Sequence, residues 1–452
     1  MPADTSAQLA EITDELNKRW PENRIEPSLD RIRLLLDYLG NPQTTFRSIH
    51  IAGTNGKTST SRMIDSLLQS FGIRTGRYTS PHLENIRERI SINGEMISPE
   101  FFIYTYNDIR PYIELVDAKS EHPLSYFEVL TAMAYAAFAD APVDVAIVEC
   151  GVGGAWDATN VIDSDVAVMT PIGLDHQEYL GDTIAKIAHT KAGIFRGGKP
   201  SVLAHQTREA AEVLLRESAV VESIPLREGL DFALLHRDVA VGGQLLTIQG
   251  IGGTYDEIFL PLHGRHQASN ATLALTAVEA FLGGGAQRLD IEVVRDGFAS
   301  VSSPGRLEVI HRNPTIIIDA AHNPHGAIAL REALSEEFSF DKLIAIVAIL
   351  ADKDGANFLS ELSEVVDEII VTENSSTRAM PAEDLFAIAS EIFDEGEVSS
   401  AGSIKRAIEL ALESASHPTQ SIGILITGSV VTAGAARSLL RSEEHTSELQ
   451  SH

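Results

Sequence analysis

Apolar residues recur along the chain with two different spacings, which predict alternating helices and strands. Residues 28–40 have one apolar face at helical spacing, and Gly40 is placed to end that helix. Residues 48–52 form a short apolar run that leads into a glycine-containing loop at 53–58. Helical spacing resumes directly afterwards, over residues 63–71. The early part of the chain therefore predicts a strand, a glycine loop and a helix in succession.

Two further apolar runs, residues 143–148 and 166–169, are short and rich in β-branched side chains, as buried parallel strands are. The middle of the chain, about residues 201–262, alternates short apolar runs with glycines. We expect this middle part to form strands that cover one flank, and the sequence assigns no chemistry to it.

A break near residues 301–304 precedes a second alternation of strands and helices. The strands expected in it are residues 315–318, 343–350, 368–371 and 422–426. The whole pattern predicts an α/β protein with two domains. Residues 1–300 are expected to form a doubly wound parallel sheet domain with a P-loop and a flanking small sheet, and residues 301–440 a Rossmann-like α/β domain. Residues 441–452 read like a translated sequencing adapter, so we expect a non-native tail, with a genuine polar tail as the alternative.

Composition narrows the class of protein. The chain has 452 residues, of which 44% are apolar and 22% charged, and its formal net charge is −29. That charge argues against general nucleic-acid binding, because a phosphate backbone requires a basic surface. No apolar stretch approaches the roughly 18 residues of a membrane helix, and the polar, acidic N-terminus is unlike a signal peptide. The single cysteine, Cys150, cannot form an internal disulfide, so we expect a cytoplasmic protein with no membrane partner.

The loop Gly53-Thr-Asn-Gly-Lys-Thr58 is the strongest chemical signal in the sequence. Backbone N–H groups at the start of a helix bind phosphate oxygens, while Lys57 supplies a positive charge and Thr58 a hydroxyl for Mg²⁺. The loop matches the shorter form of this motif, because Ile51 stands where the eight-residue form has glycine. A chance glycine turn is the alternative, and the flanking strand and helix argue against it.

Polar residues follow several of the predicted strands. Glu149 ends one strand, and Asp175 and His176 follow the next. Asp319 and His322 come after the first strand of the second domain. Ligands bind at the carboxyl edge of an open α/β sheet, so these positions favour a site, with Glu149 as a possible Mg²⁺ ligand. A surface acid and hydrogen-bonded structural histidines are the alternatives.

Lys191 lies on an apolar helical face together with Leu180, Ile184 and Ile187, in a helix expected to begin near Asp182. Burial of an ammonium group is costly. The lysine could have a depressed pKa, form an ion pair, or extend its amine to the surface, and the pattern alone leaves these alternatives open.

Nine short segments occur in one order from about residue 28 onward. They read GTNGKTST (53–60), TSPHLENIRERISINGE (79–95), SYFE (125–128), ECGVGGAWDATN (149–160), GLDHQEYLGDTIAKIAHTKAGI (173–194), HGRHQASNATLAL (263–275), PGRLE (304–308), DAAHNPHG (319–326) and TGS (427–429). In this order they resemble the folylpolyglutamate synthase and dihydrofolate synthase family of Mur-type ligases. The resemblance implies an ATP-dependent ligase that adds L-glutamate to folates, and to 7,8-dihydropteroate, through an acyl phosphate.

The resemblance also implies the ligands and their residues. ATP is the co-substrate, two Mg²⁺ sites are expected, and the protein is expected to be a monomer that binds small molecules. The ATP contacts would be Asn55, Gly56, Lys57, Thr58, Asn270, Arg306 and Asp319. The metal ligands would be Ser80, Glu149, His176 and Lys191, the last as a carbamate formed with CO₂. The folate or pteroate contacts would be Ser125, Tyr126, Phe127, Glu128 and Asp157, and the glutamate contacts His322 and Ser429. Lys57, Lys191 and His322 are the expected catalytic residues.

Two other functions stay open on the residues alone. A peptidoglycan-type Mur ligase carries a further domain before the P-loop, whereas only 52 residues precede Gly53 here. A nucleotide-binding regulator without catalysis is suggested by Ala155, which stands where the family commonly has arginine. ATP turnover that depends on pteroate or folate would discriminate among these functions.

Overall fold

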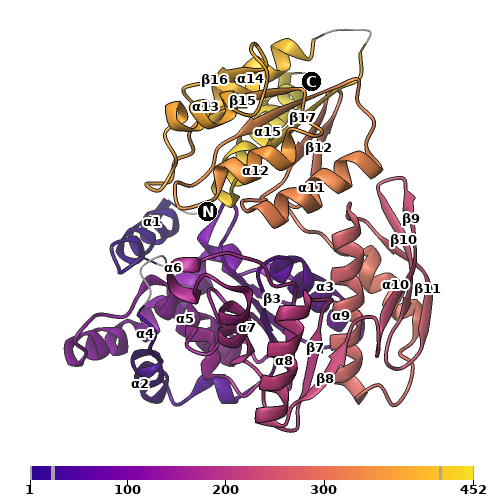
Figure 1. The fold of residues 1–452 in the computed structure, drawn as a ribbon. Coiled ribbons are helices and arrows are strands. Elements are labelled where there is room, and N and C mark those ends of the chain that lie inside the picture. Colours follow the sequence, from indigo (N-terminus) through magenta and orange to yellow (C-terminus); the bar gives the residue numbers. More distant parts are fainter. Residues whose placement is uncertain (1–2, 22–25, 417–419, 451–452) are drawn as a thin grey trace. The chain divides into compact units, whose positions relative to one another are not determined.

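The computed structural model describes residues 3–21, 26–416 and 420–450, with side chains as far as residue 442. The chain divides into two units (Figure 1). The first unit comprises Met1–Asp238, Leu245–Leu260 and Ala268–Val301. The second comprises Val239–Gln244, Pro261–Gln267 and Ser302–His452. Each unit is built around its own sheet.

The first unit contains an eight-stranded sheet in the order β4-β3-β2-β5-β1-β6-β7-β8. The strands are β1 (Arg47–Ala52), β2 (Thr75–Tyr78), β3 (Ile90–Ile92), β4 (Glu95–Met96), β5 (Val145–Glu149), β6 (Val166–Met169), β7 (Pro200–Leu203) and β8 (Ile224–Arg227). From β2 to β8 all neighbours pair in parallel, whereas β3 and β4 are antiparallel. The central strands are buried along almost their whole length, as their apolar sequence predicts.

Helices cover both faces of this sheet. They are α1 (Ala3–Asn17), α2 (Asp30–Tyr38), α3 (Lys57–Ser70), α4 (Pro99–Lys119), α5 (Tyr126–Asp140), α6 (Gln177–Leu180), α7 (Ile184–Ala192), α8 (Arg208–Val221), α9 (Arg265–Gly283) and α10 (Ile291–Ala299), with 3₁₀ turns η1 (Pro42–Thr44), η2 (Ile86–Arg89) and η3 (Ala158–Val161). Helices α1, α2, α4 and α5 share one apolar core with β2 and β5, and α7 and α8 share another with β6 and β7. Helix α3 packs on β2 and β5 and against α10. The predicted doubly wound α/β fold is confirmed.

The expectation that residues 201–262 form only strands is wrong in one part. Residues 208–221 form helix α8, because Ala210, Val213 and Leu214 recur at helical spacing and become buried, and Thr207 caps the first turn. Strands β7 and β8 belong to the main sheet, and only β9 (Ala233–Ala240), β10 (Gly243–Gln249) and β11 (Thr254–Leu260) form the small separate sheet.

The second unit has a six-stranded sheet in the order β12-β13-β17-β14-β15-β16. Its strands are β12 (Glu308–Arg312), β13 (Thr315–Ile318), β14 (Lys342–Val347), β15 (Glu368–Val371), β16 (Val398–Ser400) and β17 (Ile422–Thr427). Its helices are α11 (Pro324–Glu337), α12 (Gly355–Leu362), α13 (Ala382–Ser390), α14 (Ile404–Ser414) and α15 (Val430–Gln450). The four predicted strands are present. Strands β12 and β16 were missed because β12 is only partly buried and β16 is short and half exposed at the edge.

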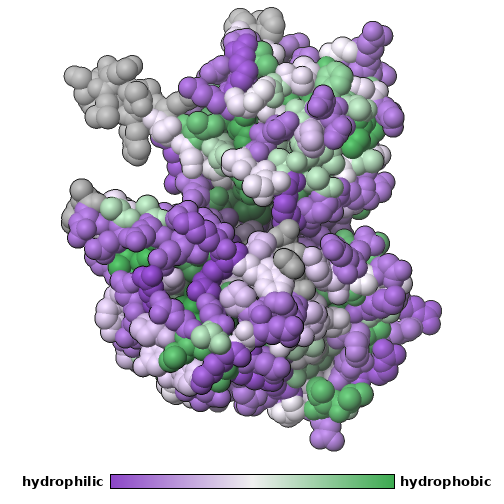
Figure 2. Space-filling view, turned by 90° about the vertical axis from the view of Figure 1, so that its left-hand side faces the viewer, coloured by the Kyte–Doolittle hydropathy of each residue, from purple (hydrophilic) through white to green (hydrophobic). Residues whose placement is uncertain are grey.

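The surface is mostly polar. Figure 2 shows hydrophilic side chains over most of the visible face, as the net charge of −29 leads one to expect. Within the described residues, no helix combines the length and the apolarity needed to cross a bilayer. Helix α15 continues past residue 440 as far as Gln450, and the adapter origin of residues 441–452 stays a prediction.

Candidate active site

The carboxyl ends of four neighbouring strands meet at one edge of the eight-stranded sheet. Parallel pairing aligns Ile51 of β1 with Glu149 of β5, and Ala52 with Met169 of β6. Strand β2 lies on the other side of β5, so Ser80, two residues beyond β2, emerges at the same edge. The glycine loop, Glu149 and the segment before His176 therefore start from adjacent positions, as the sequence predicts.

The glycine loop is closely packed on its neighbours. A Cβ on Gly53, whose φ is 143°, would lie 1.9 Å from Thr170 Oγ1, and a Cβ on Gly56, whose φ is 91°, would lie 2.5 Å from Asn270 Oδ1. Both positions therefore require glycine. The Thr54 N–H donates to the Pro171 carbonyl at 2.9 Å, which ties the loop to the end of β6. The loop brings Gly56, at the start of α3, against Asn270 of α9.

Two lysines donate to one carbonyl of this loop. Lys57 Nζ lies 3.2 Å from the Gly53 oxygen and 3.1 Å from that of Thr54. Lys191 Nζ lies 2.7 Å from the same Gly53 oxygen. Burial, together with the positive charge of Lys57, lowers the pKa of Lys191 to about 7, with Cys150 and nearby aspartates acting against this shift. Two cations crowded on one neutral oxygen favour the arrival of an anion.

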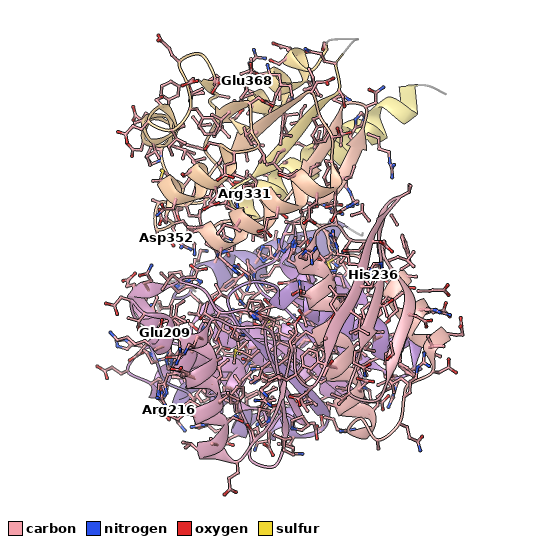
Figure 3. The ribbon with its side chains drawn as sticks, turned by 45° about the vertical axis from the view of Figure 1, so that its right-hand side comes forward. Glu209, Arg216, His236, Arg331, Asp352 and Glu368 are labelled. Carbon is pink, nitrogen blue, oxygen red and sulfur yellow. The ribbon has the colours of Figure 1, made fainter. Side chains whose placement is uncertain are left out.

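Lys191 is 5% exposed, so its amine does not reach the surface. The helix that carries it begins at Ile184, after the N-cap Thr183, close to the predicted start near Asp182. Leu180 ends the separate helix α6, because Gly181 (φ 94°) breaks the chain between them. Helix α8 holds α7 in place: the Ala185 N–H donates to Glu209 at 3.1 Å. Figure 3 labels Glu209 and Arg216 on α8.

Thr58 and Glu149 meet across the loop. The Thr58 hydroxyl lies 3.0 Å from each carboxylate oxygen of Glu149, which is 1% exposed at the end of β5. His176 lies in a loop with φ 50°, and its N–H donates to Asp175 Oδ1 at 2.9 Å. Among the described residues, no group of three or more His, Cys, Asp or Glu side chains is close enough together to hold a metal ion. Glu149 is a buried carboxylate in contact with Thr58 of the glycine loop.

Residues 151–157 form a tight loop between the glycine loop and α7. A Cβ on Gly154 would lie 2.6 Å from the Lys191 carbonyl oxygen, and one on Gly151 would lie 2.7 Å from Cζ of Phe127. The Asp157 carboxylate accepts the N–H groups of Val152 at 2.9 Å and Thr159 at 3.0 Å. Burial raises the pKa of Asp157, although these hydrogen bonds oppose the rise. Asp157 therefore organises the loop that packs on Phe127 and Lys191.

The start of α5 carries the predicted folate contacts. Ser125 Oγ accepts the Glu128 N–H at 3.2 Å, and Glu128 accepts the Ser125 N–H at 2.8 Å, which is a capping box. Arg31 also donates to Glu128, at 3.2 Å. These polar side chains fix the helix start, so the half-buried ring of Phe127 is the part with surface to offer a ligand, while the Tyr126 ring beside it is buried.

Arg89 was missed in the sequence, although it lies within one of the quoted segments. It is 2% exposed, and its Nε donates to His82 Nδ1 at 2.9 Å. Its guanidinium lies 5.2 Å from the centre of the Tyr126 ring. Burial and the Arg89 charge lower the pKa of His82 to about 3. An arginine just before a buried apolar strand is the signal that could have indicated it.

In the second unit, Asp319 and His322 lie on the loop after β13, whereas Arg306 lies in the turn before β12. Asp319 accepts the Leu307 N–H at 2.8 Å and the Ala321 N–H at 2.7 Å. It thereby joins the turn that carries Arg306 to the end of β13. His322 Nδ1 lies 3.0 Å from the Ala320 carbonyl oxygen, just before the N-cap Asn323 and Pro324, which opens α11 as predicted.

Ser429 lies beside this loop, because the Gly428 N–H donates to the Ala321 carbonyl at 3.1 Å. It is 2% exposed. Its Oγ accepts the Thr432 N–H at 3.0 Å and the Asn374 side-chain amide at 3.2 Å. The hydroxyl thus starts α15 as well as lying near His322.

Comparison with known proteins decides the family. Residues 51–278 match the Mur ligase middle domain, and residues 305–430 match the Mur ligase, glutamate ligase domain. The dihydrofolate synthase/folylpolyglutamate synthase of Mycobacterium tuberculosis is 51% identical over 96% of this chain and 94% of its own length. The chain belongs to the dihydrofolate synthase/folylpolyglutamate synthase family. The predicted family and the ligase class are confirmed.

Solved structures of this family agree with the fold. A crystal structure of the Mycobacterium tuberculosis folylpolyglutamate synthase complexed with ADP and AMPPCP has a TM-score of 0.92 at 50% identity, covering 96% of this chain and 99% of that one. The Escherichia coli FolC protein in complex with DHPP and ADP has a TM-score of 0.84 at 29% identity, covering 96% and 98%. These relatives do not favour a peptidoglycan-type ligase.

Proposed function

We propose that the chain uses ATP to activate a folate or pteroate carboxylate as an acyl phosphate and then joins it to the amine of L-glutamate. The observation that carries this proposal is the crowding of Lys57 and Lys191 on one carbonyl of a glycine loop, next to a hydroxyl–carboxylate pair at 3.0 Å. An ATP γ-phosphate supplies the anion that this group of charges favours. The relatives solved with ADP or AMPPCP support ATP as co-substrate.

The residues at the loop fit a magnesium ion. A hydroxyl and a carboxylate are hard oxygen donors, and Mg²⁺ commonly takes one or two carboxylates while nucleotide phosphates and water complete its shell. Thr58 and Glu149 would hold it here, with Ser80 and His176 as further predicted ligands. When bound, the ion neutralises charge on the transferred phosphoryl group. Lys57 and the loop N–H groups orient the same phosphate for in-line attack.

Lys191 is suited to react with CO₂. Its pKa of about 7 leaves part of the amine neutral at physiological pH. The neutral nitrogen attacks the CO₂ carbon and loses one proton, which gives an anionic carbamate. This converts a buried cation into an oxygen ligand directed at the glycine loop, and it removes the repulsion with Lys57. The carbamate is our proposal for the second metal position.

The folate or pteroate ring is proposed to bind against Tyr126 and Phe127 at the start of α5. Ser125, Glu128 and Asp157 set the shape of that wall through their backbone hydrogen bonds. In the Escherichia coli relative the printed ligand is DHPP. Since the Mycobacterium tuberculosis relative is named for both activities, we propose that dihydropteroate and tetrahydrofolates are both substrates.

The remaining roles are assigned by residue. Asn270, Arg306 and Asp319 are proposed to hold ATP, and His322 and Ser429 to hold L-glutamate. His322 is the group proposed to take the proton from the attacking amine. We further propose a cytoplasmic monomer, in line with its small-molecule substrates.

Isotope transfer tests this function. The substrate is tetrahydrofolate whose γ-carboxylate is labelled with ¹⁸O, and the released phosphate is analysed by mass spectrometry. One labelled oxygen must appear in phosphate, because the folate carboxylate oxygen attacks phosphorus and leaves with it. Phosphate without label contradicts the acyl phosphate route, and no phosphate release with any folate or dihydropteroate contradicts the proposal and favours the regulator.

A further inference from the structure

The buried side chains of His50, Thr159 and Asp157 form a hydrogen-bond series beside the loop of residues 151–157. His50, in the middle of β1, is 0% exposed, and its Nε2 lies 2.8 Å from Thr159 Oγ1. The Thr159 hydroxyl is in turn in short contact with Asp157 Oδ1. Strand β1 places the imidazole inside the core, on the face covered by α5. Burial of a polar side chain at such a place is costly unless it is hydrogen-bonded, as His50 is.

The direction of the hydrogen bonds follows from the groups present. An ionised Asp157 only accepts, so the Thr159 hydroxyl proton is directed to it, and the hydroxyl oxygen accepts from His50. Burial lowers the pKa of His50 to about 3, so its ring is neutral and carries one N–H. His50 Nδ1 has no hydrogen-bond partner in the part of the chain that the structure describes. The proton therefore belongs on Nε2, where Thr159 Oγ1 and, at 3.1 Å, Cys150 Sγ lie.

The hydrogen-bond series His50–Thr159–Asp157 ends at the wall of the proposed folate pocket. Asp157 accepts the Val152 N–H at 2.9 Å, which fixes the backbone next to Gly151. Gly151 in turn lies directly against the Phe127 ring, since a Cβ there would come within 2.7 Å of it. A shift in Asp157 would therefore move the backbone that supports Phe127.

Thr159 has a second support. The Tyr135 hydroxyl of α5 donates to the Thr159 carbonyl at 2.9 Å. The backbone of Thr159 is thus held without its hydroxyl, so loss of that hydroxyl removes one hydrogen bond to the Asp157 carboxylate while the turn keeps its anchor.

We propose that His50 and Thr159 are positioning residues for the folate or pteroate ring, acting through Asp157 and the Gly151–Val152 backbone on Phe127. The inference rests on the proposed function, because it takes Phe127 as a wall of that pocket. It predicts that loss of the His50–Thr159–Asp157 hydrogen bonds weakens binding of the pteridine substrate and leaves ATP binding unchanged.

Paired variants test this role. His50→Leu and Thr159→Val remove the hydrogen bonds at similar volume, whereas His50→Gln and Thr159→Ser keep a donor or a hydroxyl. We expect the removal variants to raise the KM for dihydropteroate or tetrahydrofolate about tenfold, as the loss of one buried hydrogen bond implies, with the KM for ATP within about twofold. The conservative variants should recover most of this loss. Ile49→Val, a neighbouring 0% exposed core residue, is the control for stability.

Three results would overturn the inference: an unchanged folate KM in variants that fold, equal shifts in both KM values, or folate KM changes in Ile49→Val that match its loss of Tm. If the removal variants do not fold, ¹⁵N NMR of the histidine rings in the wild-type protein decides. We expect the rings of His50 and His82, whose pKa values are both about 3, to stay neutral from pH 5 to 8, and the neutral ring that remains in His82→Gln, that of His50, to carry its proton on Nε2. If no neutral ring remains in His82→Gln, or if its proton is on Nδ1, the proposed hydrogen bonds of His50 are contradicted. Absence of folate-dependent turnover in the wild type refutes the proposed function instead, and the NMR result distinguishes the two failures.

Discussion

The carboxyl edges of the two sheets differ in where their polar side chains find partners. At the first sheet, Lys57, Lys191 and the Thr58–Glu149 pair come from two helices and a strand and meet at one loop. At the second sheet, Asp319 accepts backbone N–H groups of its own loop and of the turn before β12, and Ser429 accepts that of Thr432. The first edge gathers unbalanced charge that an anion can neutralise, whereas the second is a set of fixed turns. We therefore expect chemistry to depend on the first edge, and binding together with local stability on the second.

The largest expected effect is at Glu149. Glu149→Gln keeps an acceptor for Thr58 and removes the charge, so kcat should fall by roughly 100- to 1,000-fold, as loss of a metal-holding carboxylate implies. Steady-state ADP formation measures it. Glu279→Gln is the matched control, because Glu279 is also 1% exposed and binds the backbone of residues 251–252, away from this edge. It should lower Tm with kcat nearly unchanged. Equal kcat losses in both variants would show that the effect of Glu149→Gln comes from the loss of a buried carboxylate in general and not from its place at the glycine loop.

Lys191 comes next. Lys191→Met should reduce kcat by roughly 100-fold through loss of the proposed carbamate. Wild-type activity should fall in CO₂-free buffer and recover with bicarbonate, more strongly as pH rises through about 7, the pKa of Lys191, since only the neutral amine reacts. Lys186→Met, a 63% exposed lysine on the same helix, is the control. Bicarbonate dependence that persists in Lys191→Met would exclude this lysine as the site.

The same lysine predicts a trend in stability. Its folded pKa of about 7 lies below the ordinary value of 10.5, so between these two values the unfolded chain binds more protons. Unmodified protein should therefore gain stability from pH 7 towards pH 10. This slope should be smaller in Lys191→Met, as measured by urea unfolding in CO₂-free buffer at several pH values. If the free energy of unfolding depends on pH equally in both proteins, Lys191 is not the group that causes the dependence.

A smaller effect is expected at Asp319. Asp319→Asn replaces one acceptor oxygen with an N–H₂ group that faces a backbone N–H, so the free energy of unfolding should fall by about 1–3 kcal/mol. The KM for ATP should rise more than kcat falls, because the turn that carries Arg306 loosens. Asp341→Asn is the control, since exposed Asp341 accepts the Ser421 N–H at 2.7 Å in the same unit. A kcat loss as large as that of Glu149→Gln would contradict the comparison of the two edges.

The smallest effect is expected at Ser429. Ser429→Ala should cost about 1 kcal/mol of stability through loss of the hydrogen bond at the start of α15. The KM for L-glutamate should rise by a few fold if the hydroxyl also contacts this substrate. Ser403→Ala removes the corresponding bond at the start of α14 and should lower Tm without any change in that KM. The difference between the two variants isolates the glutamate contact.

The sequence predicted the first edge better than the second for a physical reason. The Gly53–Thr58 motif prescribes both a backbone shape and a chemistry, and the strand before it fixes where Glu149 emerges. Helical spacing likewise placed Lys191 inside the protein, although it could not distinguish a continuous helix from α6 and α7 separated at Gly181.

Side chains that act by binding nearby backbone groups were not recognised from the sequence. The capping box of Ser125 and Glu128 could have been predicted from their S-x-x-E spacing before an apolar run, whereas the loop-fixing role of Asp157 depends on a turn that forms only in the folded chain. His50 was not singled out for the same reason: one polar residue in an apolar strand gives no indication of its partner 109 positions away. Helix α8 was missed because its short apolar runs resemble those of strands.

The central claim is that ATP cleavage by this chain requires the carboxylate of a folate or dihydropteroate and ends in an amide bond to L-glutamate. The most direct test is ADP formation by the purified protein with Mg-ATP, L-glutamate and either dihydropteroate or tetrahydrofolate, with each component omitted in turn and the product analysed by mass spectrometry. We predict turnover only with the complete mixture, with both pteridines, and a product one glutamate longer. ATP turnover independent of the pteridine, or none in any mixture, would contradict the account.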